Sequence, residues 1–187
     1  MPNQKPLLIG FLGSIGVGKS YFARQLAPKI DAVRLSADAA RLAMFGSLEE
    51  IEARRDLSEK EDNNRLFGAI DYTVHQILKS GKSVVYDTAR FNGAANRDRL
   101  KKIANETGAQ LVYVWIETPR ELAALRVRER DEMEDQRKLT KEAADRIFSF
   151  HDEHFDAPRE GEAIIKIDGT ISFEDQFESF QKQLGEL

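Results

Sequence analysis

The residues with the clearest chemical pattern are the eight from Gly13 to Ser20, GSIGVGKS, which follow an apolar run and precede an amphipathic helix pattern. They match G-x-x-x-x-G-K-[ST] at every specified position. Glycines in such a loop allow several backbone N–H groups to converge on one phosphate at the start of a helix. The loop is therefore predicted to bind a nucleoside triphosphate, with Lys19 reaching the β- and γ-phosphates and the Ser20 hydroxyl binding Mg²⁺. The expected nucleotide-binding residues are Gly13, Ser14, Ile15, Gly16, Val17, Gly18, Lys19 and Ser20.

A carboxylate is expected on the metal side of such a loop, at the end of another strand. The run SVVYD places Asp87 directly after an apolar strand pattern, at the end where ligands bind in parallel sheets. An aspartate after a strand is also common in ordinary turns. Beside a phosphate-binding loop, however, Asp87 is the best candidate for the second Mg²⁺ ligand.

Asp38 is a candidate base for an acceptor hydroxyl, because it follows the apolar run Ala32–Leu35, whose end should open onto the same cleft. Its side chain fits the N-cap of the following helix equally well, and the residues alone leave both interpretations open. Arg41 lies three residues further on, on the same helix face, where it could hold a phosphate on the acceptor side.

Arg126 and Arg130 lie four residues apart on a helix that is expected to start at Pro119, so their side chains point the same way. Two arginines on a lid would close over the triphosphate and neutralise the charge of the transition state. Acidic neighbours such as Glu129 and Asp131 offer ordinary surface pairing instead. Both interpretations stay open from the residues alone.

The elements that must position these side chains are visible in the hydrophobic pattern. Five short apolar runs are separated by longer stretches in which apolar residues recur with helical spacing. Most runs are continuous, as in parallel strands covered on both faces by helices. The sequence thus predicts an α/β fold with a parallel sheet between helices. The runs are Leu7–Leu12, Ala32–Leu35, Val84–Tyr86, Leu111–Ile116 and Ala163–Ile167.

Length and composition narrow the class of protein. With 187 residues we expect one domain over residues 1–187, and the net charge of 28 − 32 = −4 argues against binding by bulk positive charge. The chain has no cysteine, which excludes a disulfide scaffold, a Cys-ligated zinc site and a thiol nucleophile. No apolar run approaches the ~20 residues of a membrane helix and no signal-peptide pattern is present, so we expect a cytoplasmic protein with no membrane partner.

Two stretches, residues 47–65 and 126–141, are dense in charge and poor in large apolar side chains. Each fits a solvated helical face with ion pairs between successive turns. Each equally fits a cover over an active-site cleft. In that second interpretation residues 47–65 are an insert on the acceptor side and residues 126–141 are a lid.

Several classes of triphosphate-binding protein are excluded because the sequence lacks their motifs. It has no Asn-Lys-x-Asp guanine-binding motif, it is short for a motor or ring ATPase, and Thr88 rather than a second acid follows Asp87. A compact kinase remains, which needs a base for the acceptor hydroxyl and arginines for the transferred phosphoryl group. The rival class is a nucleotide-binding switch or assembly factor with slow hydrolysis, which needs no acceptor-side base.

Five segments together resemble the P-loop kinases of the polynucleotide-kinase-like group, and more distantly the zeta-toxin and chloramphenicol phosphotransferase types, over residues 7–155. The segments are GSIGVGKS, LSADAAR, SVVYDTARFN, VYVWIETPRE and LRVRERD. The resemblance implies a three-layer α/β/α P-loop fold with a five-stranded parallel sheet in the order 2-3-1-4-5 and a helical lid. The positions that match the group's functional residues are Asp38 and Arg41 (base and acceptor-side cation), Asp87 and Thr88 (the Asp-Thr pair after the third strand), and Arg126 and Arg130 (the two lid arginines).

The acceptor side of the cleft is expected to include Thr88, Arg90 and Arg97. A few arginines, without a long basic track, indicate a short footprint. The expected reaction is transfer of the γ-phosphate of ATP, with Mg²⁺, to a hydroxyl of a short acceptor such as a 5′-hydroxyl nucleic-acid end or a nucleotide-like molecule. A small-metabolite or nucleotide-sugar kinase of the same fold is the alternative.

Two further patterns have ordinary structural interpretations. His151 and His154 lie three residues apart, but no third ligand is evident, so we interpret them as polar helix residues and not as a metal site. Trp115 lies within an apolar run and is expected in the core.

Overall fold

The computed structural model describes residues 5–129 and 141–187, without the side chains of residues 48–49, 52–59 and 143. Five strands form a sheet in the order β2-β3-β1-β4-β5, and every neighbouring pair is parallel. This arrangement confirms the predicted α/β class and the strand order that the resemblance implies. The strands are β1 (Leu7–Leu12), β2 (Ala32–Ser36), β3 (Ser83–Asp87), β4 (Gln110–Glu117) and β5 (Ile164–Asp168).

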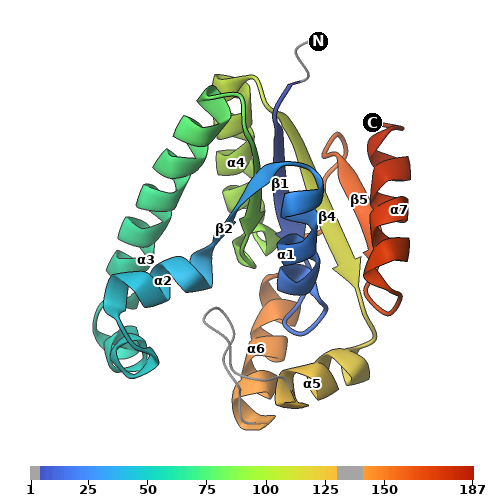
Figure 1. Cartoon of the computed structure of the whole chain (residues 1–187). Coiled ribbons are helices and arrows are strands. Elements are labelled where there is room, and N and C mark those ends of the chain that lie inside the picture. The colour runs from blue at the N-terminus through green and yellow to red at the C-terminus, as the bar shows by residue number, and fades with distance from the viewer. Residues whose placement is uncertain (1–4, 130–140) are drawn as a thin grey trace.

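Helices cover both faces of the sheet (Figure 1). The core on one face joins α1, α5, α6 and α7 to Ile9 and Phe11 of β1, and the core on the other joins α2, α3 and α4 to Leu8 and Leu12. Successive side chains of a strand point to opposite faces, so β1 contributes to both cores and is apolar throughout. The helices are α1 (Lys19–Lys29), α2 (Ala37–Phe45), α3 (Leu48–Lys79), the 3₁₀ turn η1 (Arg90–Asn92), α4 (Ala94–Thr107), α5 (Arg120–Glu129), α6 (Lys141–His154) and α7 (Phe173–Leu184).

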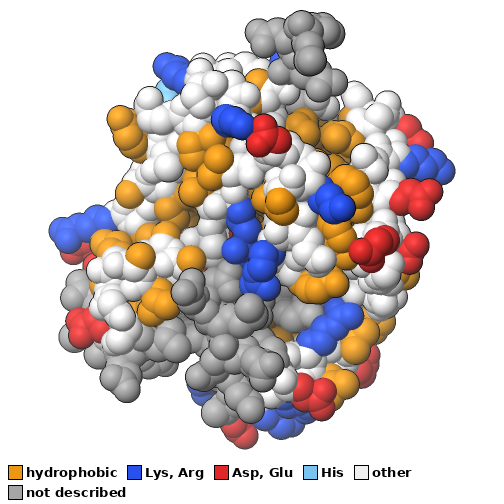
Figure 2. All heavy atoms as spheres, in the orientation of Figure 1, with side chains coloured by type: hydrophobic (Ala, Val, Ile, Leu, Met, Phe, Trp, Pro, Cys, Tyr) orange, Lys and Arg blue, Asp and Glu red, His pale blue; other side chains and the backbone are white. Residues whose placement is uncertain are grey.

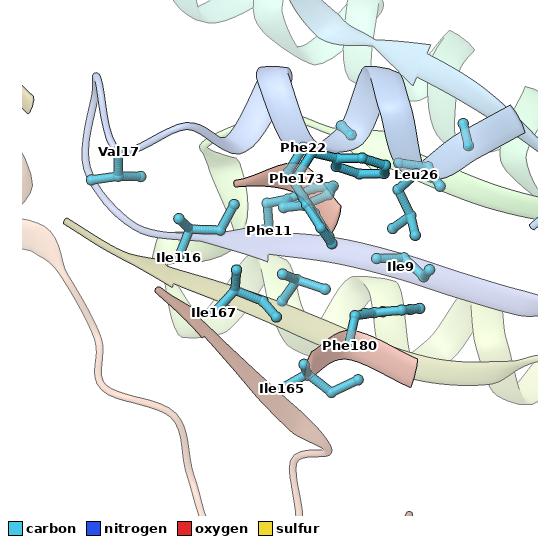
Figure 3. Packing of buried hydrophobic residues seen from close by; sticks show 14 of the residues in the cluster. Ile9, Phe11, Val17, Phe22, Leu26, Ile116, Ile165, Ile167, Phe173 and Phe180 are labelled. Atoms are coloured by element: carbon cyan, nitrogen blue, oxygen red, sulfur yellow. The ribbon is translucent and has the colours of Figure 1, made fainter. Parts of the chain in front are cut away.

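The core beneath α1 and α7 is built around four phenylalanines (Figure 3). The ring of Phe22 on α1 has its centroid 6.5 Å from that of Phe11 on β1. It lies 5.8 Å from Phe173 and 6.0 Å from Phe180, both on α7. Edge-to-face and tilted aromatic pairs of this kind add to the free energy of burial. They fix α1, and with it the loop that precedes α1, against the sheet.

Of the charged stretch 47–65, residues 48–65 form the N-terminal part of α3 and Ser47 is its N-cap. This helix is continuous over 32 residues, which is about 48 Å at 1.5 Å per residue. Its C-terminal half buries Leu66, Ile70 and Val74 in the core, while its N-terminal half extends past the sheet beside α2 (Figure 1).

The predicted lid, residues 126–141, is described only at its two ends. Arg126–Glu129 finish α5 and Lys141 begins α6, whereas residues 130–140 lie outside the described residues. In Figure 1, α5 and α6 lie below the carboxyl ends of the strands. Over the two described ranges, no helix combines the length and apolar composition needed to cross a bilayer.

Candidate active site

The loop Gly13–Gly18 joins β1 to α1 with the backbone shape that its glycines predict. Gly16 and Gly18 have φ angles of 77° and 111°, which residues with a Cβ atom rarely adopt. A Cβ on Gly16 would also lie 2.3 Å from the carbonyl oxygen of Ala123. The loop can therefore turn tightly at the start of α1, where backbone N–H groups are open to an anion.

Lys19 begins α1, and its side chain folds back across this loop. Its Nζ donates hydrogen bonds to the carbonyl oxygens of Gly13, at 2.8 Å, and Ser14, at 2.6 Å. The ammonium is thus held at the loop, where a contact with the β- and γ-phosphates is expected. The side chains of Ile15 and Val17 pack against the core, so the phosphate contact predicted for these two residues falls to their backbone.

The Ser20 hydroxyl and Asp87 lie together at the carboxyl end of β3. Ser20 Oγ donates to Asp87 Oδ1 at 3.0 Å, and Arg34 on β2 donates to Asp87 Oδ2 through Nη2 at 2.6 Å and Nε at 3.1 Å. Burial raises the pKa of the Asp87 carboxyl, and the positive charge of Arg34 opposes that rise. No local pattern in the sequence marks Arg34, because its contact with Asp87 depends on the pairing of β2 with β3.

This donor set fits Mg²⁺. A hydroxyl and a carboxylate oxygen are hard ligands, and Mg²⁺ is usually held by one or two such protein groups together with water and substrate phosphates. In the part of the chain that the structure describes, no cluster of three or more His, Asp and Glu side chains is placed to hold a metal. Ser20 and Asp87 therefore fit a Mg²⁺ site whose other ligands are phosphate oxygens and water.

Asp38 lies in the first turn of α2, one strand away from Asp87. Ser36 is the residue that caps this helix: its Oγ accepts from the backbone N–H of Ala39 at 3.2 Å. The N-cap of α2 is thus Ser36 and not Asp38. The Asp38 side chain is 69% exposed and accepts a hydrogen bond from Arg41 Nη1 at 2.9 Å.

Arg41 is held from a second side as well. Its Nη2 donates to Oδ1 of Asn63 on α3 at 2.9 Å. Ser36 pairs with Asp87 in the β2–β3 register, so the Asp38–Arg41 pair follows the strand end next to the Ser20–Asp87 pair. The structure therefore brings the predicted base and the predicted metal ligand to one edge of the sheet.

Thr88 and Arg90 follow Asp87 at the same edge. Thr88 Oγ1 accepts from the backbone N–H of Arg90 at 3.2 Å. The guanidinium of Arg90 lies 4.1 Å from the centroid of the Phe67 ring and 3.9 Å from Oδ2 of Asp71. Arg90 is thus held in place between β3 and α3 while its side chain stays partly exposed, as an acceptor-binding arginine requires.

Arg97, which the sequence analysis placed on the acceptor side, lies instead in the interior. Its side chain is fully buried, and Nε donates to Oε1 of Glu162 at 2.9 Å. The two Nη atoms donate to four backbone carbonyl oxygens, two in η1 and two in the segment that follows α6. The acceptors are Phe91, Asn92, Asp156 and Ala157. This guanidinium joins the segment after α6 to the start of α4 and is not open to an acceptor.

Of the two predicted lid arginines, Arg126 lies within the described residues and Arg130 does not. A Cβ atom built on Gly18 would lie 3.9 Å from Nη1 of Arg126, so this guanidinium is beside the last residue of the loop. Arg130 lies outside the described residues, and its role stays a prediction. Lys and Arg side chains gather near the centre of the face that carries the loop (Figure 2).

Asn92 is a site residue that sequence reasoning missed. Its Oδ1 accepts from the backbone N–H of Gly13 at 2.9 Å, and its Nδ2 donates to the carbonyl oxygen of Gly13 at 3.0 Å. These two bonds connect η1 to the start of the phosphate-binding loop across 79 positions of the chain. The sequence segment TARFN gave no local signal for this contact.

A parallel sheet in this order, with a glycine loop after its central strand and Lys19 folded over that loop, defines a P-loop protein. The chain belongs to the family whose model is described as an AAA domain, which matches residues 8–154. No curated protein matches the sequence.

Several solved structures with the same fold are kinases. A sugar kinase from Janibacter sp. HTCC2649 is 16% identical, with a TM-score of 0.67 over 97% of this chain and 95% of that one. A gluconokinase from Sinorhizobium meliloti 1021 is 18% identical, with a TM-score of 0.63 over 97% and 91%. The APS kinase CysC of Mycobacterium tuberculosis, in complex with AMPPNP and APS, is 16% identical, with a TM-score of 0.65 over 97% and 98%. At these identities the likeness shows a shared P-loop kinase fold.

Proposed function

We propose that the chain is a kinase that transfers the γ-phosphoryl group of ATP to a hydroxyl of a small acceptor. The observation that carries this proposal is the placement of two polar pairs at adjacent strand ends: Ser20 with Asp87, and Asp38 with Arg41. The first pair belongs to nucleotide and metal binding. The second has no use in a nucleotide switch, whereas a kinase needs a carboxylate and a cation for its acceptor.

In the proposed reaction the loop and Lys19 hold the β- and γ-phosphates, and Mg²⁺ held by Ser20 and Asp87 would neutralise phosphate charge. Asp38 accepts the proton of the acceptor hydroxyl as that oxygen forms a bond to the γ-phosphorus. The bond from the γ-phosphorus to the bridging oxygen breaks, and ADP carries the released negative charge. Arg126, together with Arg130, neutralises charge on the transferred phosphoryl group.

Arg41 and Arg90 are the proposed acceptor-side cations. Each is partly exposed and held by neighbours on α3, Arg41 by Asn63 and Arg90 by Phe67. Two positioned guanidinium groups suit one anionic group or a few hydroxyls. They do not form the row of cations that tracks a long nucleic acid.

Small polar molecules are therefore the acceptors that we place first. The structural relatives point the same way, since their names include a sugar kinase, a gluconokinase and an APS kinase. A 5′-hydroxyl nucleic-acid end or a nucleotide-like molecule, which the motif resemblance implies, is the second class of acceptor. Its footprint would be limited to the few nucleotides that Arg41 and Arg90 can reach.

The test is a transfer screen with γ-³²P-ATP and Mg²⁺ over sugars, sugar acids, nucleosides, nucleotide sugars and 5′-hydroxyl oligonucleotides of two and twenty residues. Transfer to one class, abolished in Lys19→Ala, is the expected result, because Lys19 is the fixed cation of the loop. Transfer that prefers the 20-mer and falls steeply with salt would contradict the small footprint. Slow hydrolysis with no transfer to any class would favour the switch or assembly factor.

A further inference from the structure

The orientation of the Asn92 side chain is fixed by its two bonds to Gly13. The amide oxygen accepts from the Gly13 N–H, and the amide nitrogen donates to the Gly13 carbonyl oxygen. Exchanging the two ends of the amide would set donor against donor and acceptor against acceptor. Nδ2 of Asn92 can therefore act only as a donor toward any third group.

That third group is the imidazole of His151 on α6, whose Nδ1 lies 3.2 Å from Asn92 Nδ2. Because Asn92 donates, Nδ1 must accept, and an imidazole that accepts at Nδ1 is neutral and carries its proton on Nε2. The surroundings favour the same form. Burial lowers the pKa of His151 and the positive charge of Lys19 lowers it further, while Asp152 opposes and Arg120 adds to the effect.

His151 lines a cavity of about 380 Å³ that lies between the phosphate-binding loop and α6, and Gly13 and Ser14 line the same cavity. Two of its lining residues carry a hydrogen-bonding group that is unused. Within residues 5–129 and 141–187, Nε2 of His151 has no partner, and the buried Ser14 hydroxyl has none either. A buried hydroxyl without a partner costs free energy, which a ligand in the cavity would recover.

The position of this cavity relative to a bound nucleotide follows from Lys19. The backbone of the loop at the start of α1 takes the phosphates nearer the nucleoside, and the lysine reaches the last two. Its Nζ lies against the carbonyl oxygens of Gly13 and Ser14, at the opposite end of the loop from Gly18. The cavity thus adjoins the end of the loop where a third phosphate would lie.

We propose that His151 and Ser14 form a subsite for the terminal phosphoryl group of a nucleoside triphosphate, with the neutral Nε2–H and the Ser14 hydroxyl as donors to its oxygens. Asn92 is the positioning residue, since it holds the ring in the donor form and ties it to Gly13. The subsite distinguishes a triphosphate from a diphosphate and rests on the proposed kinase function.

The test compares the dissociation constants of Mg²⁺-AMPPNP and Mg²⁺-ADP by calorimetry. His151→Asn keeps an acceptor near the Nδ1 position but removes the Nε2–H, whereas His151→Gln extends an N–H toward the Nε2 position. We expect His151→Asn to weaken AMPPNP binding by about tenfold or more, as for a lost hydrogen bond to a charged group, and to leave ADP binding unchanged. His151→Gln should retain most of the preference for AMPPNP, and Ser14→Ala should lose part of it.

The matched control is His154→Asn, three residues further along α6, where Nδ1 bonds the Phe150 carbonyl oxygen and the ring stacks on Phe150. This control should change neither dissociation constant. Equal weakening of AMPPNP and ADP by His151→Asn would reduce His151 to a support of the loop. Unchanged binding of both would remove the subsite.

A second measurement uses the wild-type protein, so it does not depend on the folding of a variant. The chain has three histidines, so ¹H–¹⁵N spectra of the imidazoles can be assigned directly. We expect His151 as the Nε2–H form at pH 7, with its Nε2 signal shifted by Mg²⁺-AMPPNP and not by Mg²⁺-ADP. A proton on Nδ1, or equal shifts with both nucleotides, would overturn the proposal. A failed acceptor screen with these results intact would instead remove the kinase function and leave the subsite.

Discussion

Replacing Arg97 by alanine separates a structural arginine from a binding one. The substitution leaves Glu162, whose side chain is 12% exposed, without its cation, and removes a guanidinium donor from four backbone carbonyl oxygens, of which that of Asn92 keeps the N–H of Asp156. Removing one partner of a buried ion pair costs about 3–5 kcal/mol of folding free energy. For a domain of this size each kcal/mol lowers the Tm by about 2–4 °C, so Arg97→Ala should lower it by roughly 6–20 °C.

A thermal melt followed by circular dichroism measures this loss, with Arg159→Ala as the matched control. Arg159 pairs with Asp98 at the same 2.9 Å distance, but both side chains are more than half exposed. Exposed pairs contribute at most about 1 kcal/mol, so the control should melt within a few degrees of the wild type. A Tm for Arg97→Ala no lower than that of the control would refute the structural role and return Arg97 to the acceptor side.

Two other substitutions test the remaining site geometry. Arg90→Ala should raise the KM of the acceptor about tenfold, as for a lost charge-assisted hydrogen bond, with the KM of ATP unchanged; an effect on ATP alone would contradict the acceptor-side role. Burial raises the pKa of Asp87, so the folded protein holds this proton at pH values where the unfolded chain has lost it. The contribution of Asp87 to stability is therefore present at low pH and lost as the pH rises through its folded pKa. Measured without Mg²⁺, the Tm of Asp87→Asn relative to the wild type should therefore rise with increasing pH, while turnover with Mg²⁺-ATP falls; a relative Tm that falls with increasing pH would contradict this sign.

The sheet and the phosphate-binding loop were predictable because their signals are local. Continuous apolar runs mark strands that are buried on both faces, and the spacing of Gly13, Gly18 and Lys19 is specific to one loop geometry. Parallel strands also end at one edge, so Asp38 and Asp87 could be placed together before any contact was known.

The contacts that orient the site are long-range, and this is why the sequence did not reveal them. Asn92 reaches Gly13 across 79 positions, His151 reaches Asn92 across 59, and Arg34 reaches Asp87 across 53. Arg97 was misplaced for a related reason. Its distance along the chain from Asp87 is short, but the face of α4 on which it lies turns it inward toward Glu162.

The N-cap interpretation of Asp38 was wrong because a neighbouring residue caps the helix, while its role as a base stays a prediction. Ser36 and Asp38 can both cap a helix, and the sequence does not say which of them precedes its first turn. The structure starts α2 at Ala37 and gives the cap to Ser36, so Asp38 falls inside the helix with an exposed carboxylate.

The most direct measurement of the central claim is the rate of γ-phosphoryl transfer by Asp38→Asn with the acceptor found in the screen. The variant keeps the size of the side chain and the Ser36 cap but removes the base, so transfer should fall by about 10²–10⁴ with the Kd of ATP and the Tm unchanged. Transfer at the wild-type rate, or a fall in Tm that alone explains a lower rate, would contradict the assignment of Asp38 as the base of a kinase.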